Sequence, residues 1–106
     1  NLQANARDMG DRLVDHLSPT VSASSVVVEL RGRGLMLALE TVQPGGIQPN
    51  TDAANQIMER ARGEGLLIGK GGLYGNVLRI APPMTVTKDE IDEAAQILVR
   101  VIEGLD

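Results

Sequence analysis

The clearest folding signal lies near the C-terminal end of the sequence. Thr87 precedes Glu90 by three residues, which is the capping-box pattern of a helix that starts at residue 88. Beyond it, apolar residues recur at helical spacing: Ile91, Ala94, Ala95, Leu98, Val101 and Ile102. We expect this helix to end near Gly104. A helix with one apolar face must bury it against another element, so the chain must fold as packed layers.

A β-hairpin is the first candidate for the second layer. Residues 26–31 and 35–42 are rich in β-branched and aliphatic side chains, and the segment Gly32-Arg33-Gly34 joins them. Leucines occupy every second position of the later strand, and we expect them on one face: Leu35, Leu37 and Leu39.

Weaker signals complete the order of elements. We expect a helix over residues 1–18, ended by Ser18 and Pro19, and another over 52–63 with Thr51 as its N-cap. Two short strands, over 66–68 and 77–80, flank a glycine-rich turn over 69–76. The fold class that follows is α+β. We expect a small, mainly antiparallel sheet of about four strands covered by three helices, in one domain over residues 1–106.

Composition narrows the core and the partners. Apolar residues make up 42% of the 106, yet there is no Phe, no Trp and a single Tyr, so the core must be aliphatic. The net charge is −4, which argues against nucleic acid as a partner because phosphate contacts need clustered cations. No apolar run approaches the roughly 20 residues that cross a bilayer, so we expect no membrane partner.

Cysteine is absent, which excludes disulfides and thiolate metal sites and favours a cytoplasmic protein. We expect no bound metal. The sequence starts with Asn1 inside a helical pattern, which indicates a piece of a longer protein.

The glycine-rich segment resembles a phosphate-binding loop only superficially. The Walker pattern would need glycine at Glu64 and serine or threonine at Gly71, and the dinucleotide pattern would need glycine at Tyr74. We expect a hairpin turn with positive φ angles over Gly69–Gly75, and a lid over an access channel is the other interpretation.

Three further kinds of cationic residue have ordinary explanations. His16 lies near the predicted end of the first helix, where a cation complements the helix dipole. Lys70 lies in a predicted glycine-rich turn, whereas a Schiff-base lysine needs a rigid and partly desolvated environment. We therefore expect Lys70 to be exposed to solvent. Arg31 and Arg33 are predicted to pair with surface carboxylates, and an interdomain contact is the alternative.

Arg79 is the exception, because it interrupts an apolar strand that ends on Pro82 and Pro83. A charge there is costly unless it is paired. Strand alternation places Leu78 and Ile80 on one face and Arg79 on the other. The residues alone leave two interpretations open: an internal ion pair, or a planar fork that binds the carboxylate of a ligand.

Three motifs carry a resemblance to a known family. These are Arg31-Gly-Arg-Gly-Leu-Met-Leu-Ala-Leu-Glu40, Gly65-Leu-Leu-Ile68 and Leu78-Arg-Ile-Ala-Pro-Pro-Met-Thr85. In this order, followed by a capped helix from Thr87, they resemble the C-terminal small domain of class III (subgroup II) PLP-dependent aminotransferases. These include the 4-aminobutyrate and alanine–glyoxylate types, and residues 65–87 are most similar to the latter.

The resemblance implies a fold-type-I enzyme and a role for one residue. In this family the arginine of the Leu-Arg-x-x-Pro-Pro segment, here Arg79, binds the substrate carboxylate of an amino acid or keto acid. The large domain of the family supplies the Schiff-base lysine and the groups that hold pyridoxal phosphate. The resemblance therefore implies no catalytic and no cofactor-binding residue in this chain. It further implies a homodimeric parent transaminase, contact with its own large domain, and no activity from these residues alone.

Two other functions are compatible with the residues. One is a free-standing α+β module that binds a small carboxylate ligand through Arg79 and the glycine-rich turn. The other is an assembly domain whose exposed sheet face covers a partner.

Overall fold

The computed structural model describes residues 1–66 and 68–105. Its elements, in chain order, are α1 (Leu2–Ala23), β1 (Val27–Arg33), β2 (Met36–Thr41), α2 (Thr51–Gly63), β3 (Gly69–Gly71), β4 (Val77–Ile80) and α3 (Lys88–Glu103). The four strands form one sheet in the order β1-β2-β4-β3, and each neighbouring pair is antiparallel. The predicted α+β architecture is confirmed.

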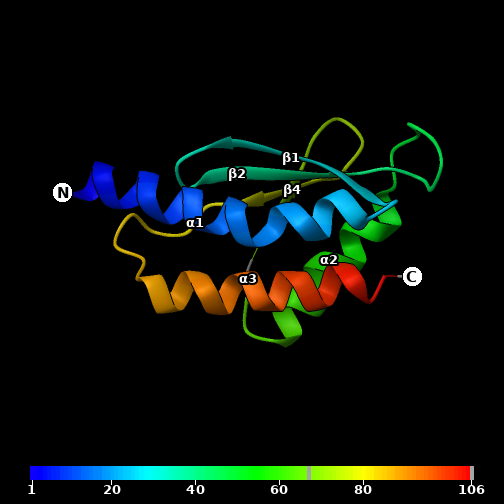
Figure 1. Cartoon of the computed structure of the whole chain (residues 1–106). Helices are drawn as coiled ribbons and strands as arrows, with labels where there is room; N and C mark the ends of the chain where they lie inside the picture. The colour runs from blue at the N-terminus through cyan, green and yellow to red at the C-terminus, as the bar shows by residue number, and fades with distance from the viewer. Residues whose placement is uncertain (67, 106) are drawn as a thin grey trace.

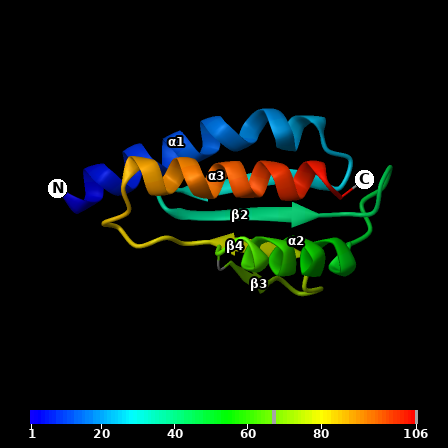
Figure 2. The same cartoon turned by 90° about the horizontal axis from the view of Figure 1, so that it is seen from below.

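The helices lie together on one side of the sheet (Figure 1). Seen from below, α3 runs between α1 and α2 and packs against both (Figure 2). The other face of the sheet is left uncovered by any element of the described residues. This arrangement divides the molecule into an apolar side under the helices and an open face.

The core between the sheet and the helices is aliphatic, as the composition predicts. Strand alternation is confirmed in β2, where Leu37 and Leu39 are buried while Met36 points outward. The largest fully buried apolar side chains come from six of the seven elements: Leu13, Leu17, Val27, Leu39, Ile57, Leu78, Ile91 and Leu98. All of them belong to one continuous cluster, which holds the helices to the strands.

The predicted end of the first helix at Ser18 is wrong, because α1 continues through Pro19 to Ala23. Pro19 lies on the exposed side of the helix, so the carbonyl that loses its backbone donor faces water. The Ser18 hydroxyl donates to a carbonyl one turn earlier at 2.7 Å. Leu17 is fully buried and Val21 packs against the core, and this packing outweighs the local cost of the proline.

The hairpin is confirmed, but its turn is shorter than predicted. Arg33 pairs with Met36, so β1 includes two of the three residues expected in the connection. Only Gly34 and Leu35 form the turn, and Gly34 has a φ of 54°, which a glycine adopts without strain.

The N-cap of α2 is Asn50 rather than the predicted Thr51. The Asn50 side chain accepts a hydrogen bond from the Ala53 N–H at 3.0 Å. The Thr51 hydroxyl instead donates to the carbonyl of Tyr74 at 2.6 Å and so joins the helix to the glycine-rich hairpin. Both residues are good caps by type, and this tertiary contact decides between them.

The predicted strand over 66–68 is also wrong where it can be checked. Leu66 and Ile68 lie outside any strand, and Leu67 lies outside the described residues. The Leu66 N–H donates to the carbonyl of Ala61 at 2.9 Å and so completes the end of α2. The strand forms later, as β3 within the predicted glycine-rich turn, where it pairs with β4.

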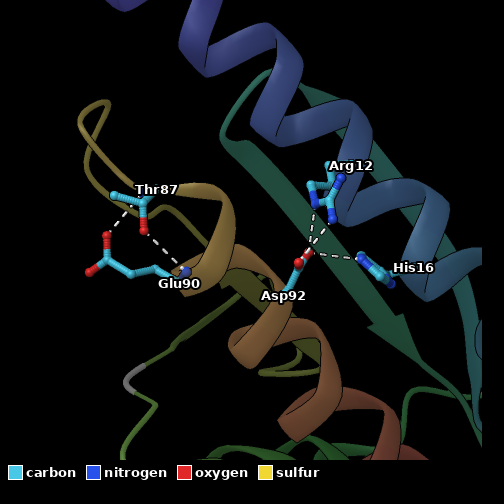
Figure 3. Close-up of polar contacts among 5 residues, drawn as sticks. All are labelled: Arg12, His16, Thr87, Glu90 and Asp92. Carbon is cyan, nitrogen blue, oxygen red and sulfur yellow. Dashed lines mark hydrogen bonds and ion pairs between the residues drawn. The ribbon is translucent and has the colours of Figure 1, made fainter.

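The last helix agrees with the prediction in detail. The Thr87 hydroxyl accepts from the Glu90 N–H at 3.2 Å, and the Glu90 carboxylate accepts from the Thr87 N–H at 2.9 Å (Figure 3). Gly104 is the C-cap. The capping box therefore determines where α3 begins, directly after the segment that leaves β4.

Candidate functional site

The open face of the sheet carries the candidate site. Register and alternation place five charged residues on this face: Glu29, Arg31 and Arg33 from β1, Glu40 from β2, and Arg79 from β4. The structure thus brings together all three arginines singled out in the sequence. It also adds two glutamates that the sequence analysis did not single out.

Strand β4 holds Arg79 firmly at its backbone. Its neighbours Leu78 and Ile80 point into the core, with 0% and 4% of their surfaces exposed, while Arg79 itself is exposed. At the start of the strand, the Asn76 side chain donates to the carbonyl of Thr41 at 2.9 Å. The backbone N–H of Thr41, a buried residue, donates to the carbonyl of Asn76 at 2.9 Å. Core packing and these bonds fix where the arginine leaves the sheet.

The residues that pair with Arg79 on the neighbouring strands are small. Arg79 pairs in register with Ala38 on one side and with Gly69 on the other. Its guanidinium extends over Gly71, where a Cβ atom would lie 2.7 Å from Cζ and from Nη2. No large side chain therefore lies beside Arg79 at these two paired positions.

The two glutamates of the open face are engaged by Arg31. Its Nη1 lies 3.2 Å from a carboxylate oxygen of Glu29 and 3.2 Å from one of Glu40. Within residues 1–66 and 68–105, Arg79 makes no ion pair and no side-chain hydrogen bond. The first interpretation of Arg79, an internal ion pair, therefore has no carboxylate partner among the described residues. Arg31 pairs with surface carboxylates, as expected, whereas Arg33 forms no ion pair within the described residues.

The glycine-rich hairpin behaves as a turn. Gly72 and Gly75 have φ angles of 82° and 64°, so the prediction of positive φ in this segment is confirmed. Lys70 pairs with Leu78 and therefore points to the helix side, where its ammonium donates to the side chain of Asn55 at 2.6 Å. Lys70 is exposed, as expected, and lies on the opposite side of the sheet from Arg79.

His16 has a different role from the one its position predicts. Because α1 continues beyond it, His16 lies within the helix rather than at its end, and the dipole explanation is wrong. Its Nε2 lies 3.0 Å from Oδ1 of Asp92, which Arg12 also binds (Figure 3). The hydrogen bond from Arg12, together with that from His16, lowers the pKa of Asp92 to about 2. Sequence reasoning missed this cluster, which joins α1 to α3.

A second feature missed by the sequence analysis is a pocket of about 430 Å³ on the helix side. Its walls include Ile80, Pro82 and Ile91, and three glutamates line it: Glu64, Glu90 and Glu93. Hydrogen bonds from the backbone and side chain of Thr87 lower the pKa of Glu90. Arg79 does not line this pocket, so the pocket and the open face are separate surfaces.

Two features are absent from the part of the chain that the structure describes. The described residues contain no group of three or more His, Cys, Asp or Glu side chains arranged to hold a metal ion. No helix among them is long and apolar enough to cross a membrane.

Comparisons with known proteins agree on one family. The family model described as aminotransferase class-III matches residues 1–102. Alanine–glyoxylate aminotransferase 2 homolog 2, mitochondrial, of Arabidopsis thaliana is 41% identical over 92 residues, which are 86% of this chain and 19% of that protein. The chain therefore spans about a fifth of the length of this curated relative.

Solved structures lead to the same family. A phospholyase from Arthrobacter, in complex with phosphoethanolamine, has a TM-score of 0.93 and 26% identity over 99% of this chain and 25% of that one. An amine transaminase from an uncultivated Pseudomonas species, in its PLP-bound form, has a TM-score of 0.83 and 33% identity over 96% of this chain and 23% of that one.

Proposed function

Because the chain belongs to the class-III aminotransferase family, we propose that it is the small domain of a pyridoxal-phosphate-dependent transaminase. We propose that Arg79 anchors the carboxylate of the amino acid or 2-oxo acid during amino-group transfer. One observation carries the assignment: Arg79 is an exposed arginine on a rigid strand, and it has no ion-pair partner in the described residues.

The chemistry of Arg79 suits this task. Guanidinium offers two parallel N–H donors to a carboxylate, and such charge-assisted pairs are both strong and directional. The backbone around it is held by core packing of Leu78 and Ile80 and by the bonds of Asn76. Because Arg79 is held in a fixed position, binding of the carboxylate also orients the substrate and limits where its reacting carbon can lie.

Pyridoxal 5′-phosphate is the cofactor of this family, but the described residues do not fit it. The chain has two lysines. Lys70 is bonded to Asn55 on the helix side, and Lys88 begins α3 beside the capping box. Neither lies on the open face with Arg79, and no step through the cofactor is assigned to this chain. We propose that the groups that hold the cofactor lie in a large domain, in the part of the family's length that this chain does not span.

Further features of the parent protein belong to the same proposal. We propose that it is a homodimer, that the small domain contacts its own large domain, and that residues 1–106 alone do not catalyse transamination. We also propose a cytoplasmic location. The Arabidopsis relative is named mitochondrial, so fractionation of the source cells is the direct check.

The test separates carboxylate binding from amine chemistry. The protein is expressed from its complete reading frame, and the rate of the donor half-reaction is followed by cofactor absorbance without an acceptor. The donor concentration that gives half of the maximal rate is called KM below. The donors are an amino acid and the matched amine that lacks the carboxylate. We expect Arg79→Ala to raise KM for the amino acid by about 10- to 100-fold, with little change for the amine.

Arg79→Lys serves as the control for charge, since it keeps the cation but loses the fork, and we expect an intermediate effect. An equal loss for both donors would show that Arg79 supports the fold rather than the carboxylate. Turnover by residues 1–106 with added cofactor, donor and acceptor would contradict the division of labour between two domains.

A further inference from the structure

We propose that Gly71 is a positioning residue for Arg79. Because glycine has no Cβ atom, the guanidinium can lie across β3 in one orientation. This orientation determines the direction from which Arg79 binds the carboxylate of the substrate. The inference rests on the proposed function of Arg79.

The geometry is specific to the guanidinium group. Gly71 pairs with Val77, two residues before Arg79 on β4, so it is a diagonal neighbour of the arginine on the open face. A Cβ atom at Gly71 would lie 2.7 Å from Cζ, 2.7 Å from Nη2 and 3.1 Å from Nε of Arg79. Three atoms of one planar group at nearly equal distances mean that the plane lies across the glycine.

The backbone of Gly71 does not itself require glycine. Gly72 and Gly75 have positive φ angles, which other residues adopt only with strain, whereas Gly71 lies in the strand without a positive φ. The atoms nearest to a Cβ at Gly71 all belong to the Arg79 guanidinium. The Arg79 guanidinium therefore occupies the space that a side chain at position 71 would fill.

A methyl group at position 71 would displace the guanidinium. A Cβ atom essentially never lies within 3.0 Å of another non-bonded heavy atom, and the end of a flexible side chain moves more easily than a paired strand. Arg79 keeps its charge and its place on β4 but loses the surface on which its plane rests. Because productive binding tolerates only about 0.5 Å and 10–20° of error, we expect weaker and misdirected carboxylate binding.

The experiment compares two glycines of the same strand. Gly69 faces the same side as Gly71, but a Cβ there would meet only Cβ of Arg79, at an ordinary contact distance of 4.0 Å. In the donor half-reaction of the full-length protein, we expect Gly71→Ala to raise KM for the amino acid about tenfold. We expect Gly69→Ala to leave it within about twofold. KM for the matched amine should stay constant in both variants.

A double-mutant cycle with Arg79→Ala tests whether Gly71 acts through the arginine. If it does, Gly71→Ala has no further effect on KM once Arg79 is removed. Thermal unfolding of each variant reports on folding, and Gly71→Ser provides a second probe of the same space. Equal KM values for Gly71→Ala and Gly69→Ala, or additive effects in the cycle, would overturn the inference. An unchanged KM in Arg79→Ala itself would instead overturn the proposed function.

Discussion

Arg12 of α1 binds Asp92 of α3 through two hydrogen bonds that join residues far apart in the chain. Nε donates to Oδ1 at 2.6 Å and Nη2 donates to Oδ2 at 2.9 Å (Figure 3). The pair raises the pKa of Arg12 and lowers that of Asp92 to about 2. It connects the first helix to the last across the outside of the helical layer.

This pair predicts a specific loss of stability in acid. The pKa of Asp92 is lower in the folded chain, about 2, than its ordinary value of 3.8. The pair therefore stabilises the fold fully above about pH 4, and this contribution is lost as the pH falls towards 2. We expect Asp92→Asn to lower the urea midpoint at pH 7 and to weaken its dependence on pH between 4 and 2.

The matched control is Asp11→Asn, because Asp11 is exposed on α1 next to Arg12 in sequence and makes no ion pair within the described residues. It should leave the acid limb of the stability curve as it is in the parent. If Asp92→Asn and the parent lose stability in parallel between pH 4 and 2, the Arg12–Asp92 pair does not contribute as the geometry implies.

Gly10 predicts a second and larger effect, on packing. It is buried in α1, and a Cβ there would lie 2.0 Å from the carbonyl oxygen of Gly34 in the hairpin turn. Both partners are backbone, so neither moves aside without shifting the helix or the turn. We expect Gly10→Ala to destabilise the fold by about 3 kcal/mol, measured by urea unfolding.

Gly63 provides the comparison, since it is also helical and a Cβ there meets nothing within 4 Å. We expect Gly63→Ala to stabilise the chain by about 0.5 kcal/mol, from helix propensity alone. Similar values for the two variants would mean that α1 does not approach the turn as closely as described.

Thr87 tests whether the capping box contributes as its geometry predicts. Thr87→Ala removes the acceptor of the Glu90 N–H, and we expect a loss of about 1 kcal/mol in urea unfolding. Thr87→Ser keeps the hydroxyl and should retain most of the stability. An equal loss in both variants would assign the effect to the methyl group of threonine rather than to the cap.

Elements with strong local signals could be predicted from the sequence, and α3 and β4 are the clearest cases. The capping box marks the start of α3, and the predicted strand over 77–80 matches β4 residue for residue. Pro19 shows the limit of local rules. A proline predicts a helix end, but the burial of Leu17 and the packing of Val21 hold the helix together beyond it.

The candidate site also has features that local sequence patterns predict and features that depend on tertiary packing. Alternation along β4 is a local property, and it correctly predicts that Arg79 lies on the face opposite Leu78. The proximity of Gly71 depends on the register between β3 and β4, and the sequence suggests a loop there. Arg12 and Asp92 come into contact only because α1 and α3 pack together, and the local sequence around neither residue predicts this contact.

Arg31 gives a prediction that joins the surface charges to the site. It binds both glutamates of the open face, and Ala38 pairs in register with Arg31 on one side and Arg79 on the other. Glu40 lies two residues further along the same strand face and is a diagonal neighbour of both Arg31 and Arg79 in the register. We infer that Arg31 keeps this carboxylate away from Arg79.

Replacing Arg31 by glutamine frees the Glu40 carboxylate on the same face as Arg79. A neighbouring carboxylate then competes with the substrate for Arg79, and we expect KM for the amino acid donor to rise about three- to tenfold. The double variant Arg31→Gln with Glu40→Gln removes the competitor and should restore KM to near the parent value. Failure of this rescue would show that Arg31 acts on the fold of the hairpin, because a loss of structure is not repaired by removing a second charge.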